Sequence, residues 1–303
     1  MVTVTLPADL VETAWLAEHL YDPRLRVVDM RWRGDGSGRR LYYQGHIPGA
    51  VHLDWHSDLN GGSADDLLLP PDRFAALMAA NGIGDDSAVV AYADTDHSGA
   101  ARLWWALHYH GHEQVAVLNG GIDKWLAEGR SLTTAVPQPA AARFMPRLQP
   151  RWLATADEIA ATLENRAAGA QLVDTRPPEQ YAGLAVWSPQ GSRYLPPGQA
   201  WIEVDGARLR AGHIPGAVHL HSVDNLAPDW TYRSPPDLAT LAAQAGLRTD
   251  RRVILYCGVG ISASLGLFSL HLAGFNDLAL YDASWREWGA DPDRPVEVMA
   301  QPA

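Results

Sequence analysis

A nine-residue sequence, GHIPGAVHL, occurs twice in this chain of 303 residues, at positions 45–53 and 212–220. A short apolar run that ends in Asp-x-Arg precedes each copy, at 27–31 and 172–176. A second apolar run follows each copy, at 89–92 and 253–256. The same elements recur in the same order, which is the pattern of an internal structural repeat. The repeat predicts two halves with the same fold.

Short apolar runs alternate with longer amphipathic stretches in both halves. The short runs are typical of buried strands, and the longer stretches have the length and polarity pattern of helices. Strands that alternate with helices predict an α/β fold, in which helices flank a mainly parallel central sheet on both faces. The predicted helices cover Asp9–Leu20, Pro71–Asn81, Ala101–His110, Thr155–Ala167, Pro236–Ala245 and Ser262–Leu272.

A proline-rich segment, Ala135–Pro150, lies between the two halves. Proline has no backbone donor and resists both helix and sheet, so such a segment favours a linker. The chain is also long enough for two domains that each bury a core. We therefore predict a first domain at 1–135, a linker at 136–150 and a second domain at 151–303.

The second half contains an insertion that the first half lacks. Asp29 and His46 are 17 positions apart, whereas Asp174 and His213 are 39 positions apart, so the second half has 22 additional residues. They lie at about 180–211 and include Trp187. Long loops within compact domains are uncommon unless they are functional. We expect this insertion to supply a lid and positive charge, with an ordinary surface loop as the alternative.

Composition limits the classes of partner. Lys and Arg number 24 against 35 Asp and Glu, for a net charge of −11, which gives no general attraction for nucleic acid or for an anionic membrane. No apolar run approaches the roughly 20 residues that cross a bilayer. The first 20 residues lack the basic start and apolar block of a secretion signal. We predict a cytoplasmic protein with neither nucleic acid nor membrane as partner.

Cys257 is the only cysteine of the chain, which excludes an internal disulfide and a metal site built on clustered cysteines. His46 and His213 occupy the same place in the two repeats, but no cluster of further ligands accompanies them. Hydrogen bonding within the fold is the role predicted for His213. No metal ion and no cofactor are predicted.

The sequence around Cys257 predicts a reactive thiol. An apolar strand ends at Tyr256, the loop CGVGIS follows at 257–262, and a helical pattern begins directly after it. Unpaired N–H groups and the helix dipole at a helix amino terminus attract an anion. Glycines at 258 and 260 let the backbone N–H groups converge on one point. Because this setting favours the thiolate, which is the nucleophile, Cys257 needs no separate histidine base; an inert buried cysteine is the alternative.

The corresponding loop of the first half has no cysteine. A constant offset between the halves places Asp94 opposite Cys257, whereas pairing Tyr92 with Tyr256 places Ala93 there. Acidic residues in that loop would repel an anion. The first domain is therefore predicted to be catalytically silent.

These features together resemble the rhodanese superfamily, specifically the tandem-domain thiosulfate and 3-mercaptopyruvate sulfurtransferases, over nearly the whole chain. The resemblance is carried by the Asp-x-Arg strand, the GHIPGA turn in both halves, LNGG at 118–121 with Trp125, and YDASWREW at 281–288, with the cysteine loop in the second half only. It implies two rhodanese-like domains, the second catalytic. The loop has six positions, as in family sulfurtransferases, and lacks the closing arginine of the longer loop in related phosphatases.

The resemblance implies a double displacement through a persulfide. Cys257 would take a sulfur atom from thiosulfate or 3-mercaptopyruvate, and a thiophilic acceptor such as cyanide, a thiol or thioredoxin would remove it. The active-site loop would comprise Gly258, Val259, Gly260, Ile261 and Ser262.

The donor is left open between the two compounds. Mercaptopyruvate enzymes resemble Cys-Gly-Ser-Gly at this loop and thiosulfate enzymes Cys-Arg-Lys-Gly. Gly258 and Gly260 favour the former, but Val259 has neither the serine hydroxyl nor the lysine charge. The resemblance also places Asp35 and His46 where mercaptopyruvate enzymes have first-domain contributors.

The arginine that would bind the donor is also left open. Gln180 stands where the family places one such arginine. The candidates for binding the donor are Arg193, Arg208 and Arg210. A non-catalytic or regulatory module that binds anions or relays persulfide is the alternative to the enzyme. Failure of Cys257 to gain one sulfur atom would favour that alternative.

Overall fold

The computed structural model describes residues 4–62, 67–95, 97–165 and 169–299. The chain divides into two compact units. The first unit contains most of the described residues up to Pro150 together with Leu226–Tyr232, and the second contains the others.

The first unit is built on a five-stranded sheet in the order β1-β5-β4-β2-β3, in which every pair of neighbours is parallel. Its strands are β1 (Leu10–Val11), β2 (Leu25–Asp29), β3 (Val51–His52), β4 (Ala88–Tyr92) and β5 (Val115–Leu118). Its helices are α1 (Thr13–His19), α2 (Ser37–Gln44), the π-helix η1 (Trp55–Leu59), α3 (Pro71–Ala80), α4 (Ser98–Tyr109) and α5 (Gly121–Ala127).

The second unit repeats this architecture in the order β12-β7-β13-β14-β6, again with parallel neighbours only. The strands of this sheet are β6 (Leu153–Ala154), β7 (Gln171–Asp174), β12 (Val218–His219), β13 (Val253–Tyr256) and β14 (Leu278–Tyr281). The helices are η2 (Pro150–Trp152), α6 (Ala156–Glu164), α7 (Pro178–Tyr181), η3 (Ser222–Asn225), α8 (Pro235–Gln244), α9 (Ile261–Leu272) and α10 (Ser284–Trp288). The predicted α/β fold with two similar halves is confirmed.

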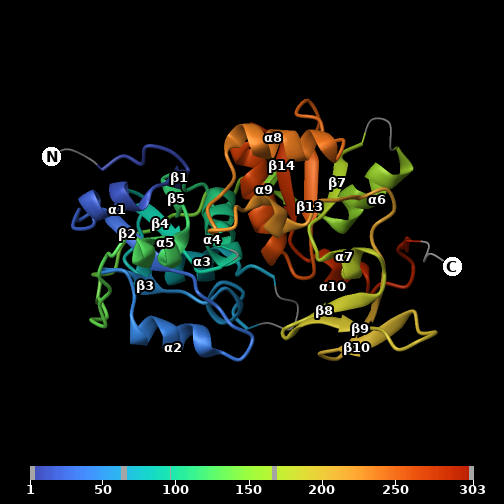
Figure 1. Cartoon of the computed structure of the whole chain (residues 1–303), viewed down its shortest axis with the longest axis horizontal. Coiled ribbons are helices and arrows are strands. Elements are labelled where there is room, and N and C mark those ends of the chain that lie inside the picture. Colours follow the sequence, from blue (N-terminus) through green and yellow to red (C-terminus); the bar gives the residue numbers. More distant parts are fainter. Residues whose placement is uncertain (1–3, 63–66, 96, 166–168, 300–303) are drawn as a thin grey trace. The chain divides into compact units, whose positions relative to one another are not determined.

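The central strands are buried on both faces because helices cover each sheet. Every residue of β4 and of β13 is buried. In the second unit α8 and α9 pack against each other on one side of the strands, and α6 lies on the other side (Figure 1). This arrangement explains why the central strands are continuous apolar runs rather than alternating ones.

The repeated GHIPGA sequence builds the same turn twice. His46 stacks on Tyr42 at 3.9 Å between ring centroids, and the Tyr42 hydroxyl donates to the carbonyl oxygen of Ala50 at 2.8 Å. His213 stacks on Tyr181 at the same distance, and the Tyr181 hydroxyl makes the equivalent bond at 2.9 Å. Nδ1 of His213 lies 2.8 Å from the carbonyl oxygen of Tyr181, so this histidine participates in hydrogen bonding within the turn.

The proline-rich segment packs on the first unit. Residues 134–149, all of them described, form no helix or strand. The N–H of Ala142 donates to the carbonyl oxygen of Ala79 at 3.0 Å, that of Arg147 donates to His110 at 2.8 Å, and Phe144 is buried. The segment predicted as a linker therefore lies along the first unit up to the boundary at Pro150.

The additional residues of the second half, expected as a loop, form two antiparallel hairpins. The first joins β8 (Ala185–Ser188) to β9 (Gly191–Tyr194), and the second joins β10 (Trp201–Val204) to β11 (Ala207–Arg210). They share a small apolar cluster that includes Val186 and Ile202. The second hairpin turns at Asp205-Gly206, whose φ angles of 46° and 77° fit the left-handed positions of a tight hairpin turn.

The helix predicted at Asp9–Leu20 is wrong over its first residues, because Leu10–Val11 form strand β1 and helix α1 covers only Thr13–His19. The other predicted helices differ from the observed ones at their ends. Helix α6 ends at Glu164, whereas the predicted helix continues to Ala167. The last two residues of that predicted helix lie outside the described part of the chain. Among the described residues, none of the helices combines the length and the apolar character that a membrane span requires.

Candidate functional site

Cys257 lies directly after β13, at the carboxyl edge of the second parallel sheet. The residue is 2% exposed, and it is a free thiol. The carboxyl ends of parallel strands are where ligands bind in open α/β sheets. The only cysteine thus lies at the end of a central strand where such folds place their sites.

The loop after Cys257 leads directly into helix α9. Gly260 precedes the helix with φ 78° and ψ −2°, a left-handed conformation that glycine adopts at little cost. The hydroxyl of Ser264 donates to the carbonyl oxygen of Gly260 at 2.8 Å and holds the first turn. The first N–H groups of an α-helix have no partner within the helix, and in α9 this end directly follows the loop. The order of strand, glycine loop and helix start is the one that the sequence predicted.

Helix α10 holds the loop from the other side. The N–H of Trp285 donates to the carbonyl oxygen of Cys257 at 2.9 Å, and that of Arg286 donates to Gly258 at 3.0 Å. The hydroxyl of Ser284 accepts the N–H of Cys257 at 3.1 Å and donates to the carbonyl oxygen of Tyr281 at 2.8 Å. Sequence reasoning did not assign Ser284 a role, although it lies in the YDASWREW stretch.

A buried ion pair lies beside the loop. Arg176 binds both carboxylate oxygens of Asp174, at distances of 2.6–3.1 Å, and also the carbonyl oxygen of Gly212 at 2.6 Å. Its guanidinium carbon lies 4.3 Å from the ring centroid of Trp285. Burial opposes the charge on Arg176, but the interactions with Asp174, joined by smaller ones with Tyr256 and Cys257, together raise the arginine's pKa. This pair is the Asp-x-Arg motif, which was not singled out as part of the site.

The three candidate arginines occupy different environments in the hairpins. Arg210 donates to the carbonyl oxygens of Gly289 at 3.2 Å and Arg294 at 2.9 Å, and it also donates to the carbonyl oxygens of Trp288 and Asp291.

Arg208 stacks on the half-exposed Trp201, with its guanidinium carbon 3.6 Å from the ring centroid. Arg193 donates to the carbonyl oxygen of Glu203 at 2.9 Å. The contacts of Arg210 with backbone carbonyls favour a structural role for this residue. The donor-binding role of Arg193 or Arg208 stays a prediction.

Asp35 and His46 are not brought together within the first unit. Asp35 is exposed and accepts the N–H of Ser37 at 2.9 Å before α2, and its hydrogen bonding to Ser37 lowers its pKa. His46 is fully buried, with its ring nitrogens 2.8 Å and 3.2 Å from the carbonyl oxygens of Tyr42 and Ala135. Their roles in the reaction stay predictions.

Ala93 is the residue of the first half that corresponds to Cys257. The N–H of Ile122 donates to the carbonyl oxygen of Ala93 at 3.0 Å, just as Trp285 donates to Cys257. The hydroxyls of Tyr92 and Tyr256 likewise accept the equivalent N–H groups of the GHIPGA turns. Of the two alignments that the sequence left open, the structure selects the one that places Ala93 opposite Cys257.

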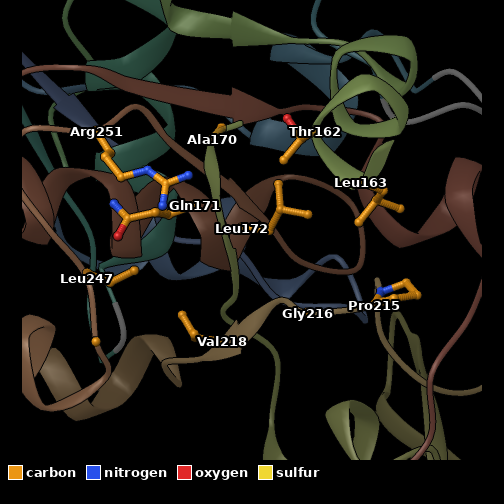
Figure 2. A pocket seen from close by; sticks show the side chains of 11 residues that line it. Thr162, Leu163, Ala170, Gln171, Leu172, Pro215, Gly216, Val218, Leu247 and Arg251 are labelled. Carbon is orange, nitrogen blue, oxygen red and sulfur yellow. The ribbon is translucent and has the colours of Figure 1, made fainter. Parts of the chain in front are cut away.

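A cavity of about 230 Å³ lies elsewhere in the second unit, near the start of β7. Figure 2 shows the guanidinium of Arg251 beside the amide of Gln171, with Leu172 and Leu247 among the apolar lining. Because β7 and β13 are parallel, this cavity lies at the sheet edge opposite to Cys257. None of the predicted site residues lines it.

Comparison with known proteins agrees with this geometry. The family model described as Rhodanese-like domain matches residues 12–128 and again 155–291. The chain is 35% identical to the sulfur carrier protein TtuD of Thermus thermophilus, over 93% of this chain and 94% of that protein. It is also 35% identical to a thiosulfate sulfurtransferase of Corynebacterium glutamicum, over 96% and 91%.

A solved structure extends the comparison to the fold. The crystal structure of the 3-mercaptopyruvate sulfurtransferase SseA from Escherichia coli superposes with a TM-score of 0.76 at 26% identity, over 92% of this chain and 99% of that one. The resemblance noted from the sequence is confirmed. The chain therefore belongs to the rhodanese family, as a tandem of two rhodanese-like domains.

Proposed function

We propose that this chain is a sulfurtransferase that carries a sulfane sulfur on Cys257. The observation that carries the proposal is the placement of the only cysteine between the end of β13 and the glycine that precedes α9. The dipole and the backbone N–H groups at a helix amino terminus stabilise an anion, and a persulfide on Cys257 is such a group. The full-length relatives named as sulfurtransferases support the same reaction class.

The reaction proceeds in two balanced steps. In the first, the Cys257 thiolate attacks the outer sulfur of thiosulfate, a sulfur–sulfur bond forms, and sulfite leaves with the electron pair of the broken bond. With 3-mercaptopyruvate, the carbon–sulfur bond breaks and the thiol proton ends on carbon, giving pyruvate. In the second, cyanide or a thiol attacks the outer sulfur of the persulfide, and the Cys257 thiolate is the leaving group.

The loop gives the donor no charged side chain. Between Cys257 and Ser262 the side chains are apolar or absent, and Val259 is itself buried. The negative donor is therefore bound by backbone N–H groups, with Arg193 or Arg208 as additional cations. This loop does not favour one donor over the other, so the rates with thiosulfate and with 3-mercaptopyruvate have to be compared on one preparation.

A matched pair of variants tests the proposal. Cys257→Ser is expected to abolish thiocyanate formation from thiosulfate and cyanide, and pyruvate formation from 3-mercaptopyruvate and a thiol. Ala93→Ser places the same residue at the corresponding position of the first unit and is expected to retain turnover. Unchanged turnover in Cys257→Ser would refute the proposal. Intact mass after donor treatment should show one added sulfur atom in the wild-type chain and none in Cys257→Ser.

A sulfur-carrier role is the second candidate, because one of the similar full-length relatives is named a sulfur carrier protein. A carrier would gain one sulfur atom on Cys257 but would release it slowly to cyanide and small thiols. The burial of the Cys257 side chain favours small acceptors over a protein acceptor and therefore favours the enzyme. Single-turnover discharge of the persulfide by cyanide separates the two candidates.

A further inference from the structure

Gly258, next to Cys257, is in direct contact with the side chain of Trp187. A β-carbon at position 258 would lie 2.7 Å from both Cβ and Cγ of Trp187 and 3.2 Å from its Cδ1. Real β-carbons essentially never approach other atoms so closely. The backbone at Gly258 is not in the left-handed region, so an alanine would adopt it without strain. Trp187, rather than the loop backbone, is what requires glycine here.

The first half provides an internal comparison. Since Ala93 corresponds to Cys257, Asp94 corresponds to Gly258. Asp94 carries a side chain at this loop position, and Arg33 binds its two carboxylate oxygens at 3.0 Å and 2.6 Å. The same strand-end loop therefore accommodates a side chain in the first unit. In the second unit the indole of Trp187 occupies that place.

The first hairpin of the insertion holds Trp187 in position. Trp187 lies in β8, opposite Ser192 of β9. Its neighbour Val186 points to the other face of the hairpin and is buried in the cluster that the two hairpins share. Ser192 accepts a hydrogen bond from the side-chain amide of Gln180 at 2.9 Å, which ties the hairpin to α7. The pairing of β8 with β9 therefore positions the backbone of Trp187, and the contact with Gly258 positions its indole.

We propose that Trp187 is a specificity-determining residue of the sulfur-transfer site. Its half-buried indole forms the wall beside Cys257 that a side chain at 258 would otherwise form, and it limits the cross-section of any molecule that reaches the sulfur. Narrow anions such as cyanide and thiosulfate pass this wall, whereas branched or aromatic thiols are excluded. The proposal rests on the proposed function, since it names the size class of reactant that the same site admits.

Chemical modification of Cys257 tests the wall without requiring turnover. In the folded chain, one rate is measured for alkylation by iodoacetamide and another for thiol–disulfide exchange with the bulky 5,5′-dithiobis(2-nitrobenzoate). Trp187→Ala is expected to raise the ratio of the bulky to the small reagent's rate by about tenfold, the lower end of what small changes in a pocket achieve. Tyr194→Ala, an exposed aromatic residue of the same hairpin, is the matched control and should leave the ratio unchanged. An unchanged ratio in folded Trp187→Ala would overturn the proposal.

A double-mutant cycle tests the contact itself. Gly258→Ala is expected to lower the melting temperature and the alkylation rate in the wild-type background, but to have little effect in the Trp187→Ala background. Residues in direct contact show such non-additivity, whereas independent sites give additive effects. Additive effects of the two substitutions would contradict the proposal. If the modification results hold but no variant transfers sulfur, the wall is correct and the proposed function fails instead.

Discussion

The N–H of Trp285 donates a 2.9 Å hydrogen bond to the carbonyl oxygen of Cys257, and this bond fixes the end of β13 to the start of α10. The residue before Trp285 is Ser284, with φ 53°, and the corresponding residue of the first half is Gly121, with φ 54°. The two residues therefore share a left-handed φ angle. Only the second unit adds a hydroxyl there, which accepts the N–H of Cys257.

Replacing Ser284 by alanine isolates the contribution of this hydroxyl. Alanine keeps the β-carbon, so the left-handed strain stays the same, but the buried N–H of Cys257 loses its acceptor. We expect a loss of about 1–3 kcal/mol in the free energy of unfolding. Ser269→Ala is the matched control, because that buried hydroxyl donates only to the carbonyl oxygen of Leu265 within α9. Denaturant unfolding measures both, and equal losses in the two variants would argue against a special role for Ser284.

The buried Asp-x-Arg pairs predict a second stability effect. The side chains of Arg176 and Asp174 are 1% and 0% exposed, and those of Arg31 and Asp29 are 7% and 0% exposed. Replacing either arginine by methionine leaves a buried carboxylate without its partner, which costs about 3–5 kcal/mol. Arg248 and Asp250 form an exposed pair with 65% and 63% of each side chain accessible, so solvent screens their attraction and Arg248→Met should change the stability little. Comparable losses in all three variants, measured by denaturant unfolding, would contradict this account.

Local patterns predicted the scaffold and the placement of Cys257. Continuous apolar runs mark β4 and β13, and the glycines after Cys257 mark the loop before α9, because each feature depends on neighbouring residues. The contacts of Ser284 and Trp187 with the loop join residues far apart in the chain, and no local period encodes them.

The two hairpins of the insertion and helix α2 were also not predicted. Asp205-Gly206 is a recognisable hairpin signal. The flanking strands have only four residues each, which is too short for a clear alternating pattern, and their apolar residues pack against another hairpin rather than within a core of their own. Helix α2 is strongly polar, with only Gly38 and Tyr42 buried, so its apolar stripe is too narrow to predict a helix.

The candidate arginines should separate into two classes. Arg210→Ala removes a guanidinium that binds several backbone carbonyls around the end of α10, and we expect a stability loss of about 1.5–3 kcal/mol. Arg193→Ala and Arg208→Ala should leave stability nearly unchanged, and the one that binds the donor should raise KM for it. Initial rates over a range of donor concentrations, with unfolding curves for each variant, measure both effects. If neither variant changes KM, the donor's charge is bound by the backbone N–H groups alone.

Acid stability of the first unit depends on Glu128. Its carboxylate accepts from Nζ of Lys124 at 2.6 Å and from Nε of Arg130 at 3.0 Å, and these bonds, with one from Thr13, lower its pKa from 4.5 to about 2. A carboxyl whose pKa is lower in the folded state stabilises the fold above its unfolded pKa, and this contribution is lost as the pH falls from 4.5 towards 2. Glu128→Gln should therefore be less stable than the wild type at neutral pH, by no more than about 1 kcal/mol because the side chain is partly exposed.

The difference between the two proteins should shrink as the pH falls below 4.5 and disappear below pH 2, where the carboxyl of the folded wild type is protonated as well. Urea unfolding at a series of pH values measures this convergence. Glu113→Gln, at an exposed position of the same unit, is the control for the substitution itself. A Glu128→Gln difference that stays constant down to the lowest pH would mean that the glutamine disturbs packing, and that the ion pairs with Lys124 and Arg130 do not stabilise the fold.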